Sequence, residues 1–424
     1  MKRKIIQSIK GFNDILPDKI DLYYSIEDSI TKISNQYCLK EIRVPFIEKS
    51  DLFNRSIGKE TDIVTKEMYE FTDKNNDSIC LRPEGTASIV RSALEHNLIY
   101  DRGIKKQKYW YYGPMFRHER PQKGRFRQFM QYGVEFFGYS DTNSDIEIIM
   151  LVNQLFNNLN LNNITLHINS LGSNNDRNKY KRIILDYLDE FKKDLNEDQL
   201  KTLSKNPLRL LDSKDKNIKD ILKNIPSLID SINKDSKLRF TTLTSKLDEL
   251  KIKYIIDNTI VRGLDYYNDT VFEWKTNELG SQDAICAGGR YDSLVEKIGN
   301  INIPAIGFAV GIERIVELIK NNTHTNKKNV EIPIINISEE NKIFCSKISS
   351  ELRRQFSDIS FYNTDSSSSL SSQLKISRKL NSSFAIIISD KSEVENIFTI
   401  KYFNKEPDNN LSKEQLFQHI ERIK

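Results

Sequence analysis

The spacing of apolar residues near the start of the chain predicts a helix followed by a strand. Over residues 21–38, apolar side chains recur every three or four positions, as at Leu22, Ile26 and Ile30. Residues at this spacing share one face of a helix, so the segment is typical of an amphipathic helix. The next residues, 41–46, are mostly β-branched or aromatic and predict a short strand with Pro45 near its end.

Aromatic and β-branched residues cluster in two later segments, 108–112 and 130–137. They predict two antiparallel strands joined by a long polar connection over residues 118–127. Residues 172–250 are rich in Lys, Asp and Leu at helical spacing and predict a helical insertion. Other strands are expected at 166–169, 253–256 and 271–274, and other helices at 141–160 and 312–320.

The pattern changes after residues 321–329, a polar stretch that predicts a linker. Beyond it, short apolar segments alternate with amphipathic ones, which indicates a small α/β domain with a mostly parallel sheet. The strands are expected at 332–337, 359–362, 384–389 and 397–403, and the helices at 339–355, 369–380 and 411–423. The chain is therefore expected to form two domains, 1–325 and 326–424.

Composition adds a few limits to this picture. A length of 424 residues exceeds one ordinary domain, and the net charge of +5 is compatible with a nucleic-acid partner without establishing one. The four cysteines and five histidines show no metal-site spacing. No apolar stretch approaches the roughly 18 residues of a membrane span, so we expect a cytoplasmic protein with reduced thiols and no membrane partner.

Charge is concentrated in residues 102–127, which contain nine Lys or Arg and the single acid Glu119. Such a cluster repels itself unless an anion lies nearby, and phosphates are the obvious candidates; the alternative is a solvated basic face. The pair Arg117 and Glu119 favours a phosphate site over a solvated basic face. A guanidinium can clamp a phosphate while the nearby carboxylate accepts a hydrogen bond from an amine.

These residues resemble a known family. Phe116–Glu119 resembles motif 2 of the class II aminoacyl-tRNA synthetases, and Tyr112–Gly138 resembles the histidyl enzymes of that class. Glu41–Pro45, continuing to Phe53, is similar to motif 1, and Gly307–Arg314 is similar to motif 3. Further segments similar to the histidyl family are Lys10–Pro17, Leu81–Thr86, Val261–Tyr267 and Ala287–Asp292. Several motifs in the family's order carry far more weight than any one glycine-rich stretch.

The resemblance implies a fold and an activity. It implies a catalytic core built on an antiparallel sheet over residues 1–325, with motifs at about 22–53, 108–138 and 304–320, and an anticodon-binding α/β domain over 326–424. The expected activity is ATP-dependent activation of L-histidine to histidyl-adenylate. The histidine is then transferred to the 3′ end of histidine tRNA, and AMP and diphosphate are released. The expected assembly is a homodimer formed through motif 1. Mg²⁺ is expected on the phosphates, with no protein metal ligands assigned.

The resemblance also implies roles for individual residues. Arg117 and Arg262 are the expected catalytic residues, with Arg262 near the histidine carboxylate and the α-phosphate. Adenine is expected between the Phe129 ring and the Arg314 guanidinium. The expected ATP-binding residues are Arg117, Glu119, Arg125, Phe129 and Arg314. The expected histidine-binding residues are Glu84, Gly85, Thr86, Gln131, Glu135, Arg262, Tyr266 and Tyr267. The expected contacts to the tRNA acceptor end are Arg120 and Gln122.

Several alternatives stay open at this level. Glu135 lies in an apolar strand, where an unpaired carboxylate is costly, so it needs either a ligand or a structural partner. Arg262 could instead form a structural pair with Asp265. Gly288 and Gly289 could allow close approach to a ligand or form a simple turn. At the level of the whole chain, the rivals are a synthetase-like regulatory subunit, another class II synthetase and a non-catalytic RNA-binding module. The Val261–Tyr267 segment argues against the first two, and the C-terminal domain also argues against the regulatory subunit. A non-catalytic RNA-binding module would not need Arg117, Arg262 and Arg314 together.

Overall fold

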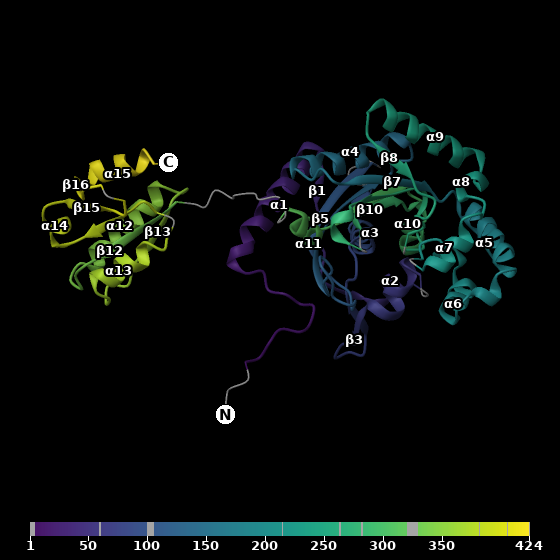
Figure 1. Cartoon of the computed structure of the whole chain (residues 1–424), viewed down its shortest axis with the longest axis horizontal. Coiled ribbons are helices and arrows are strands. Elements are labelled where there is room, and N and C mark those ends of the chain that lie inside the picture. Colours follow the sequence, from purple (N-terminus) through teal and green to yellow (C-terminus); the bar gives the residue numbers. More distant parts are fainter. Residues whose placement is uncertain are drawn as a thin grey trace. The chain divides into compact units, whose positions relative to one another are not determined.

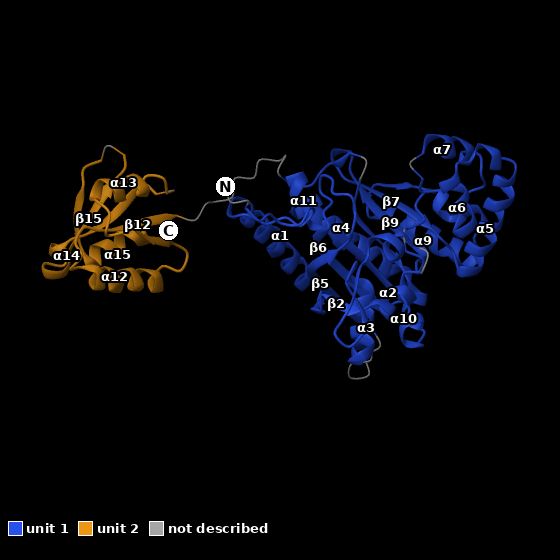
Figure 2. Ribbon diagram, turned by 90° about the horizontal axis from the view of Figure 1, so that it is seen from below, with its two compact units in different colours: residues 1–324 blue, residues 325–424 orange. Residues whose placement is uncertain are grey.

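A computed structural model describes residues 5–58, 61–99, 106–213, 215–262, 264–280, 283–319, 330–380, 382–404 and 406–423. The chain divides into two compact units, residues 1–324 and 325–424 (Figure 2). The predicted linker and the predicted boundary after residue 325 lie in 320–329, outside the described residues, so they stay predictions. Among the described residues, no helix is both long and apolar enough to cross a membrane.

Unit 1 is built on an eight-stranded sheet with the order β1-β5-β6-β11-β10-β9-β7-β8 (Figure 1). All neighbouring strands are antiparallel except the outer pairs β1–β5 and β7–β8. This confirms the expected antiparallel core. The strands are β1 (Lys40–Glu41), β5 (Gln107–Phe116), β6 (Gln128–Phe137), β7 (Thr165–Ser170), β8 (Tyr254–Ile256), β9 (Asn268–Lys275), β10 (Ala284–Arg290) and β11 (Ala305–Gly311).

The hairpin of β5 and β6 is the predicted aromatic hairpin, extended to ten residues in each strand. Successive side chains of a strand point to opposite faces of the sheet. Trp110, Tyr132 and Val134 accordingly belong to one hydrophobic cluster and Tyr109 and Tyr111 to another. The sheet is therefore buried on both faces, which explains why the aromatic residues occur in consecutive runs rather than in strict alternation.

Helices cover both faces of this sheet. One cluster joins the sheet to α1 (Pro17–Gln36), α4 (Thr142–Asn158), α9 (Lys234–Glu249) and α11 (Ile312–Ile319). The other cluster joins it to α2 (Ser50–Ser56), α3 (Thr86–Glu95) and α10 (Asp292–Gly299). The second face carries the candidate site described below.

The predicted strand over 41–46 is wrong in extent. Only Lys40 and Glu41 pair with β5, and the chain then runs on to β2 (Ile47–Lys49), which belongs to a separate sheet. Pro45 lies between the two and has no N–H with which to extend the ladder. The separate sheet has the order β2-β4-β3, with β3 (Tyr69–Thr72) and β4 (Ser78–Leu81).

Residues 174–249 are mostly helical. They contain α5 (Asn174–Asp189), α6 (Glu197–Lys205), α7 (Lys216–Leu222), α8 (Leu228–Ser231) and α9, with short 3₁₀ turns between them. Ser173 and Asn196 begin α5 and α6 as capping boxes, in which the side chain satisfies a backbone N–H of the first turn.

Unit 2 is an α/β domain with its own hydrophobic core. Its sheet has the order β13-β12-β14-β15-β16, and the strands are β12 (Glu331–Asn336), β13 (Ser360–Asn363), β14 (Phe384–Ile388), β15 (Ile397–Tyr402) and β16 (Asn409–Ser412). The helices are α12 (Lys342–Gln355), α13 (Leu370–Ser377), α14 (Asp390–Val394) and α15 (Lys413–Glu421). The parallel arrangement expected from the sequence holds for β13, β12 and β14, whereas β15 and β16 are antiparallel. The sheet is therefore mixed.

Candidate active site

The site begins with the alternation of side chains along β6. Phe129, Gln131 and Glu135 occupy alternate positions and therefore share one face of the sheet. Gly133 lies between them, because the Tyr111 ring occupies the space where its side chain would stand: a Cβ there would lie 2.2 Å from the ring. The Tyr111 hydroxyl donates a hydrogen bond to Gln131 Oε1 at 3.2 Å. This contact fixes the orientation of the Gln131 amide.

A cavity opens over this face, walled by the β5–β6 connection, the 262–267 loop, α11 and strands β9 to β11. It contains most of the residues that the sequence analysis singled out. The expected residues that line it are Glu84, Thr86, Arg117, Glu119, Arg125, Phe129, Gln131, Arg262, Tyr266, Tyr267 and Arg314. Gly85 and Glu135 lie behind the wall, next to Thr86, and Arg120 and Gln122 are exposed on the β5–β6 connection.

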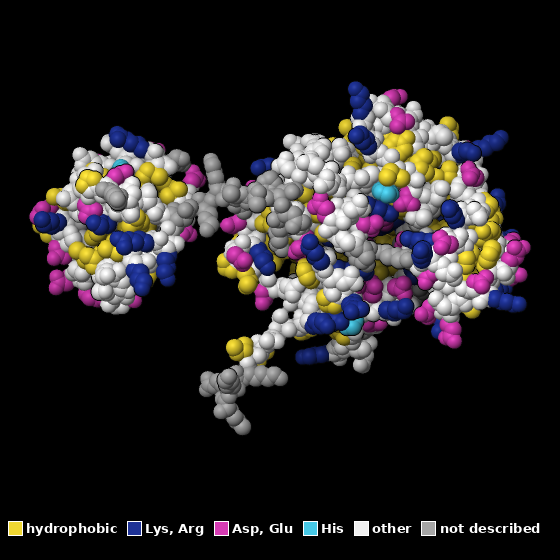
Figure 3. All heavy atoms as spheres, viewed as in Figure 1, with side chains coloured by type: hydrophobic (Ala, Val, Ile, Leu, Met, Phe, Trp, Pro, Cys, Tyr) yellow, Lys and Arg dark blue, Asp and Glu magenta, His cyan; other side chains and the backbone are white. Residues whose placement is uncertain are grey.

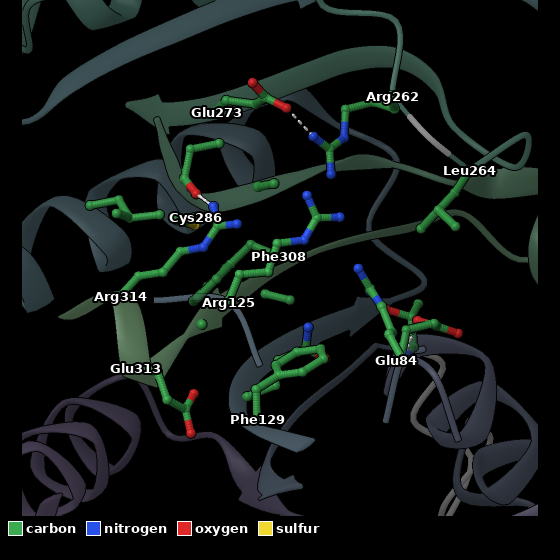
Figure 4. Close-up of a pocket in the computed structure, with 18 of the residues that line it drawn as sticks. Glu84, Arg125, Phe129, Arg262, Leu264, Glu273, Cys286, Phe308, Glu313 and Arg314 are labelled. Atoms are coloured by element: carbon green, nitrogen blue, oxygen red, sulfur yellow. Dashed lines mark hydrogen bonds and ion pairs between the residues drawn. The ribbon is translucent and has the colours of Figure 1, made fainter. Parts of the chain in front are cut away.

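Four arginines converge on this cavity. Arg125, Arg262 and Arg314 point toward one another from different elements (Figure 4), and Arg117 lines the same space. Burial, together with repulsion from Arg125 and Arg117, lowers the pKa of Arg314 to about 10. Burial also lowers the pKa of Arg117. A concentration of cations with depressed pKa values fits a site that receives a polyanion.

Each arginine is held by an acceptor within the chain. Arg125 forms an ion pair with Glu119, and Arg314 donates to the backbone carbonyl of Ala284. Arg117 Nε donates to the Pro83 carbonyl at 2.8 Å, and its guanidinium lies over the Phe129 ring at 5.3 Å from the ring centre. The expected adenine site between Phe129 and Arg314 is not tested by this arrangement and stays a prediction.

Two buried carboxylates lie on the opposite side. Glu84 accepts hydrogen bonds from the backbone N–H groups of Thr86 and Ala87, at 2.7 and 2.9 Å, at the start of α3. Burial raises the pKa of Glu84, although these backbone bonds and the nearby Arg117 oppose the rise. Glu84 is thus a fixed acceptor in the cavity wall.

Glu135 has structural partners, as its apolar strand required. Its carboxylate accepts hydrogen bonds from Thr86 Oγ1 at 2.7 Å and from the Tyr291 hydroxyl. Burial raises the pKa of Glu135 to about 8, against the effect of these two bonds. The neighbouring Tyr266 hydroxyl is buried and has no hydrogen-bond partner among the described residues. That hydroxyl lies in the cavity wall and fits a polar group of a ligand.

Arg262 pairs with Glu273 of β9, and Asp265 instead accepts a hydrogen bond from Asn206 at 3.2 Å. The alternative pair of Arg262 with Asp265 is therefore wrong. Burial alone would lower the pKa of Arg262, but Glu273 and the Tyr267 ring raise it overall. The Arg262 backbone has φ +65°, a left-handed conformation that is uncommon for residues other than glycine and is often found at functional sites.

The sequence analysis missed several residues that line the cavity: Leu264, Glu273, Cys286, Phe308 and Glu313. Glu313 accepts hydrogen bonds from the Met130 N–H at 2.9 and 3.0 Å, and burial raises its pKa to about 7. Glu273 lies in the predicted strand 271–274, but nothing in that segment alone indicates its pairing with Arg262. Leu264, Phe308 and Glu313 lie within the family-like segments Val261–Tyr267 and Gly307–Arg314 but were given no individual role.

Gly288 and Gly289 do not line the cavity. A Cβ on Gly288 would lie 2.4 Å from the Gly307 carbonyl, and one on Gly289 would lie 2.6 Å from the Thr270 carbonyl. Their small size serves close strand contacts rather than the ligand approach or the turn considered from the sequence.

The exposed part of the β5–β6 connection carries Arg120 and Gln122. This connection runs beside β3, since the His118 N–H donates to the Glu67 carbonyl and the His118 ring contacts Tyr69. On the face drawn in Figure 3, several Lys and Arg side chains gather around β3, while acidic and basic side chains are mixed over the rest of unit 1. The local basic surface agrees with the charge clustering along the sequence.

Comparison with known proteins decides the family. The model of the family described as histidyl-tRNA synthetase matches residues 11–315. The chain is a member of the histidyl-tRNA synthetase family. It is similar to the histidine–tRNA ligase of Buchnera aphidicola (subspecies Schizaphis graminum), with 44% identity over 99% of this chain and 98% of the relative. It is also similar to a chloroplastic histidine–tRNA ligase of Pyropia yezoensis, with 43% identity over 99% and 96%.

The fold agrees with this family. The crystal structure of apo histidyl-tRNA synthetase from S. aureus has 29% sequence identity and a TM-score of 0.80, and it covers 98% of this chain and 99% of its own. The class II architecture inferred from the motifs, an antiparallel catalytic sheet with a second α/β unit, is thereby confirmed.

Proposed function

We propose that this chain is an ATP-dependent histidine–tRNA ligase that forms histidyl-adenylate and transfers histidine to histidine tRNA. The observation that carries the proposal is the convergence of Arg117, Arg125, Arg262 and Arg314 on one cavity whose opposite wall holds Glu84. A triphosphate and a carboxylate require cations, and an amino-acid ammonium requires a fixed acceptor. The cavity has both, on the fold of a family with this activity.

In the adenylation step, the histidine carboxylate attacks the α-phosphorus of ATP and displaces diphosphate. Negative charge accumulates on the phosphorus oxygens as attack proceeds, and cations already fixed around the cavity stabilise it without reorganisation. We assign Arg117 and Arg262 to this charge, and Arg125 and Arg314 to the nucleotide phosphates. Glu119 is paired with Arg125 in this structure. When the nucleotide phosphates bind Arg125, Glu119 is released to accept a hydrogen bond from the adenine amino group. Phe129 and Arg314 hold the adenine ring between them.

Histidine is recognised on the carboxylate side. We assign Glu84, Thr86 and Gln131 to the α-ammonium, and Glu135 and Tyr267 to the imidazole, with Tyr266 beside them. Arg262 lies close to the substrate carboxylate, and Gly85 belongs to the same histidine site. Neutral imidazole presents one donor and one acceptor nitrogen, so it suits a pocket that offers both an acid and phenolic hydroxyls. Glu135 acts from behind Thr86, to which it is hydrogen-bonded.

Mg²⁺ would enter with the nucleotide. Four carboxylates line the cavity, and each is already engaged by the chain: Glu84, Glu119, Glu273 and Glu313. The described residues contain no group of three or more side chains suited to hold a metal ion. Mg²⁺ commonly keeps several waters and is carried by substrate phosphates with one or two carboxylates, and this donor set fits that mode. When bound, it neutralises phosphate charge.

The remaining assignments concern partners. Arg120 and Gln122, on the exposed β5–β6 connection, contact the tRNA acceptor end, and residues 326–424 bind the anticodon. The chain forms a homodimer through the motif 1 region, where Tyr24, Phe46 and Ile47 are exposed. Sedimentation at micromolar concentration should therefore give twice the chain mass, and an active monomer would contradict this. The cytoplasmic location stays a prediction, since one relative is named as chloroplastic.

Pyrophosphate exchange tests the activity directly. With each of the twenty amino acids offered separately, labelled pyrophosphate should enter ATP with histidine alone. Charging of histidine tRNA by the same preparation tests the transfer step. Exchange with another amino acid, or none with histidine, would overturn the proposal.

A further inference from the structure

A single carboxylate sets where the Arg262 guanidinium lies. Arg262 Nη1 donates to Glu273 Oε1 in an ion pair, drawn as a dashed line in Figure 4. Both side chains are largely buried, with 14% and 17% of their surfaces exposed. Arg262 Nε is buried and has no hydrogen-bond partner among the described residues. The guanidinium is thus anchored at one amino group by Glu273, and it lies over the Tyr267 ring at 5.3 Å from the ring centre.

Glu273 is in turn held from its other side. Its second oxygen lies 3.3 Å from Lys275 Nζ, which lies 3.1 Å from Asp257. Asp257 is hydrogen-bonded to His167 Nδ1 at 2.9 Å. The charges alternate along this row from Arg262 through Glu273 and Lys275 to Asp257, and His167 is hydrogen-bonded at its far end. Lys275 therefore restricts the Glu273 carboxylate while Glu273 restricts Arg262.

The sheet fixes the base of this arrangement. Glu273 lies in β9, opposite His167 of β7 on one side and Ala287 of β10 on the other. Glu273 itself lines the cavity, and its strand is flanked by β10 and β7, so it does not lie at an edge of the sheet. A side chain rooted there has little freedom to move, whereas Arg262 is on a loop. The sheet therefore fixes Glu273, and Glu273 in turn positions Arg262 on its loop.

A carboxylate at this position has a cost for substrate binding. ATP and the histidine carboxylate are both anions, and Glu273 repels them and competes with them for Arg262. If only ground-state binding mattered, removing Glu273 would improve the binding of both substrates. An interaction that weakens binding can still raise kcat when it holds a cation where charge develops in the transition state. A free arginine also loses side-chain conformational entropy when it is ordered.

We propose that Glu273 is a positioning residue that pre-aligns Arg262 for the adenylation step, with Lys275 holding Glu273 in place. The inference rests on the proposed function and goes beyond it by assigning a role to an acid whose charge opposes substrate binding. The proposal predicts different effects on the rate of the chemical step and on the KM values. Loss of the Glu273 charge slows the chemical step and leaves the KM values for histidine and ATP unchanged or lower.

The test is Glu273→Gln, which keeps the size of the side chain and removes its charge. Single-turnover adenylation should slow about 10- to 100-fold, the scale on which misplacing one catalytic group is felt. KM for histidine and ATP should stay the same or fall. Glu273→Asp keeps the charge at shorter reach and should retain more of the rate. An unchanged rate in Glu273→Gln, or a loss in Glu273→Asp as large as in Glu273→Gln, overturns the proposal.

Asp257→Asn is the matched control. Asp257 also pairs with Lys275, and its side chain is 16% exposed. The substitution removes its charge in the same way, but Asp257 bonds to Lys275, His167 and Thr259 rather than to Arg262. Its adenylation rate should stay within about threefold of wild type. A slowing equal to that of Glu273→Gln would mean that the whole ion row is needed structurally, which contradicts a specific role for Glu273.

A double-mutant cycle separates this proposal from the function on which it rests. If Glu273 acts through Arg262, the variant Arg262→Ala/Glu273→Gln should be no slower than Arg262→Ala alone. Full additivity of the two losses overturns the positioning role. If the wild-type protein exchanges pyrophosphate with histidine, Arg262→Ala is slow and Glu273→Gln is normal, only this inference fails. If the wild-type protein does not activate histidine, the proposed function fails first.

Discussion

At the scale of single residues, the cavity is a set of charged groups, each already paired within the chain. Arg125 and Arg262 are bound to carboxylates, and Arg314 to a backbone carbonyl. The cations are therefore ordered before any substrate arrives. Such preorganisation lets a charged site act on developing charge without the cost of reorganising at the moment of reaction.

Arg262→Lys should slow adenylation about 10²–10³-fold. Lysine keeps a cation beside Glu273, so folding should be preserved and Tm should change by only a few degrees, but it has no planar fork to bridge two oxygens. Lys275→Arg is the control, since it makes the reverse exchange at the other cation of Glu273 and lies outside the cavity lining. Single-turnover rates and melting curves measure both. A near-normal rate for Arg262→Lys would mean that charge alone suffices.

Glu135 should make the protein less stable as pH rises. Its pKa is raised in the folded state, to about 8, above the ordinary value of 4.5. The folded state therefore binds the proton more tightly, so this contribution to stability is complete below pH 4.5 and is lost as pH rises toward 8. The loss amounts to roughly 5 kcal/mol across that window, at about 1.4 kcal/mol per pKa unit. Glu135→Gln mimics the protonated form and should flatten this part of the curve.

Urea unfolding at several pH values between 5 and 8.5 measures the difference between the two proteins. The free energies of unfolding of wild type and Glu135→Gln should differ least near pH 5, and the difference should grow toward pH 8. Parallel curves would place the folded-state pKa of Glu135 near its ordinary value. The same variant should raise KM for histidine more than KM for ATP, since Glu135 binds Thr86 and lies away from the arginines.

At the scale of elements, the N-terminal segment holds the β5–β6 connection in place. The Gly11 carbonyl accepts hydrogen bonds from the N–H groups of Arg127 and Gln128, at 2.9 and 3.3 Å. Arg127 Nε donates to the Glu119 carbonyl at 3.1 Å. Phe12 packs against Phe116 and Tyr69. A segment far from the cavity in sequence thereby supports the backbone of Glu119.

Gly11→Ala should raise KM for ATP about tenfold or less while leaving KM for histidine nearly unchanged. Gly11 has φ +88°, and an added Cβ would lie 2.7 Å from Arg127 Cγ, so the segment must move away from the connection that carries Glu119. A non-glycine residue in this conformation costs about 1–2 kcal/mol. Gly280→Ala is the control, with φ +72° and no atom within 4 Å of the added Cβ. Equal ATP effects in both variants would point to general destabilisation.

The elements also show how far the sequence predicts the fold. The β5–β6 hairpin, α4, β7 and most elements of unit 2 were predicted because large apolar residues mark them, whereas the short elements α14 and β16 were missed. Strands β10 and β11 were missed because glycines interrupt their apolar residues, at Gly288 and Gly289 in β10 and at Gly307 in β11. Packing requires this: a Cβ on Gly307 would lie 1.7 Å from Glu135 Oε2. Glycine breaks the apolar periodicity of a central strand, so the sequence pattern alone does not distinguish such a strand from a loop.

The same reasoning applies to the site. Its residues were predicted where a motif names them, as at Arg117, Thr86 and Tyr267, and these do line one cavity. Glu273 was missed because its role depends on register: only the pairing of β9 with β7 and β10 brings it to Arg262 and Lys275. Ion pairs between distant segments are a property of the fold and have no local signature.

At the scale of the whole molecule, the chain consists of two units with separate cores. Two hydrophobic clusters belong to unit 1, and a third belongs to unit 2. All residues that line the candidate cavity lie in unit 1. Chemistry and the proposed anticodon recognition are thus assigned to parts of the chain that can fold separately.

A chain ending at residue 324 should keep histidine-dependent pyrophosphate exchange within about tenfold of wild type, because every cavity residue remains. Its KM for histidine tRNA should rise at least about tenfold, which corresponds to roughly 1.4 kcal/mol of lost binding. Charging and exchange should be measured on the same preparation, with circular dichroism to confirm folding. The matched control is an uncut chain with Arg120→Ala, in which the acceptor-end contact is lost and unit 2 remains. An unchanged tRNA KM after truncation would remove residues 326–424 from tRNA recognition, whereas loss of exchange in a folded truncated chain would show that unit 2 supports the catalytic unit itself.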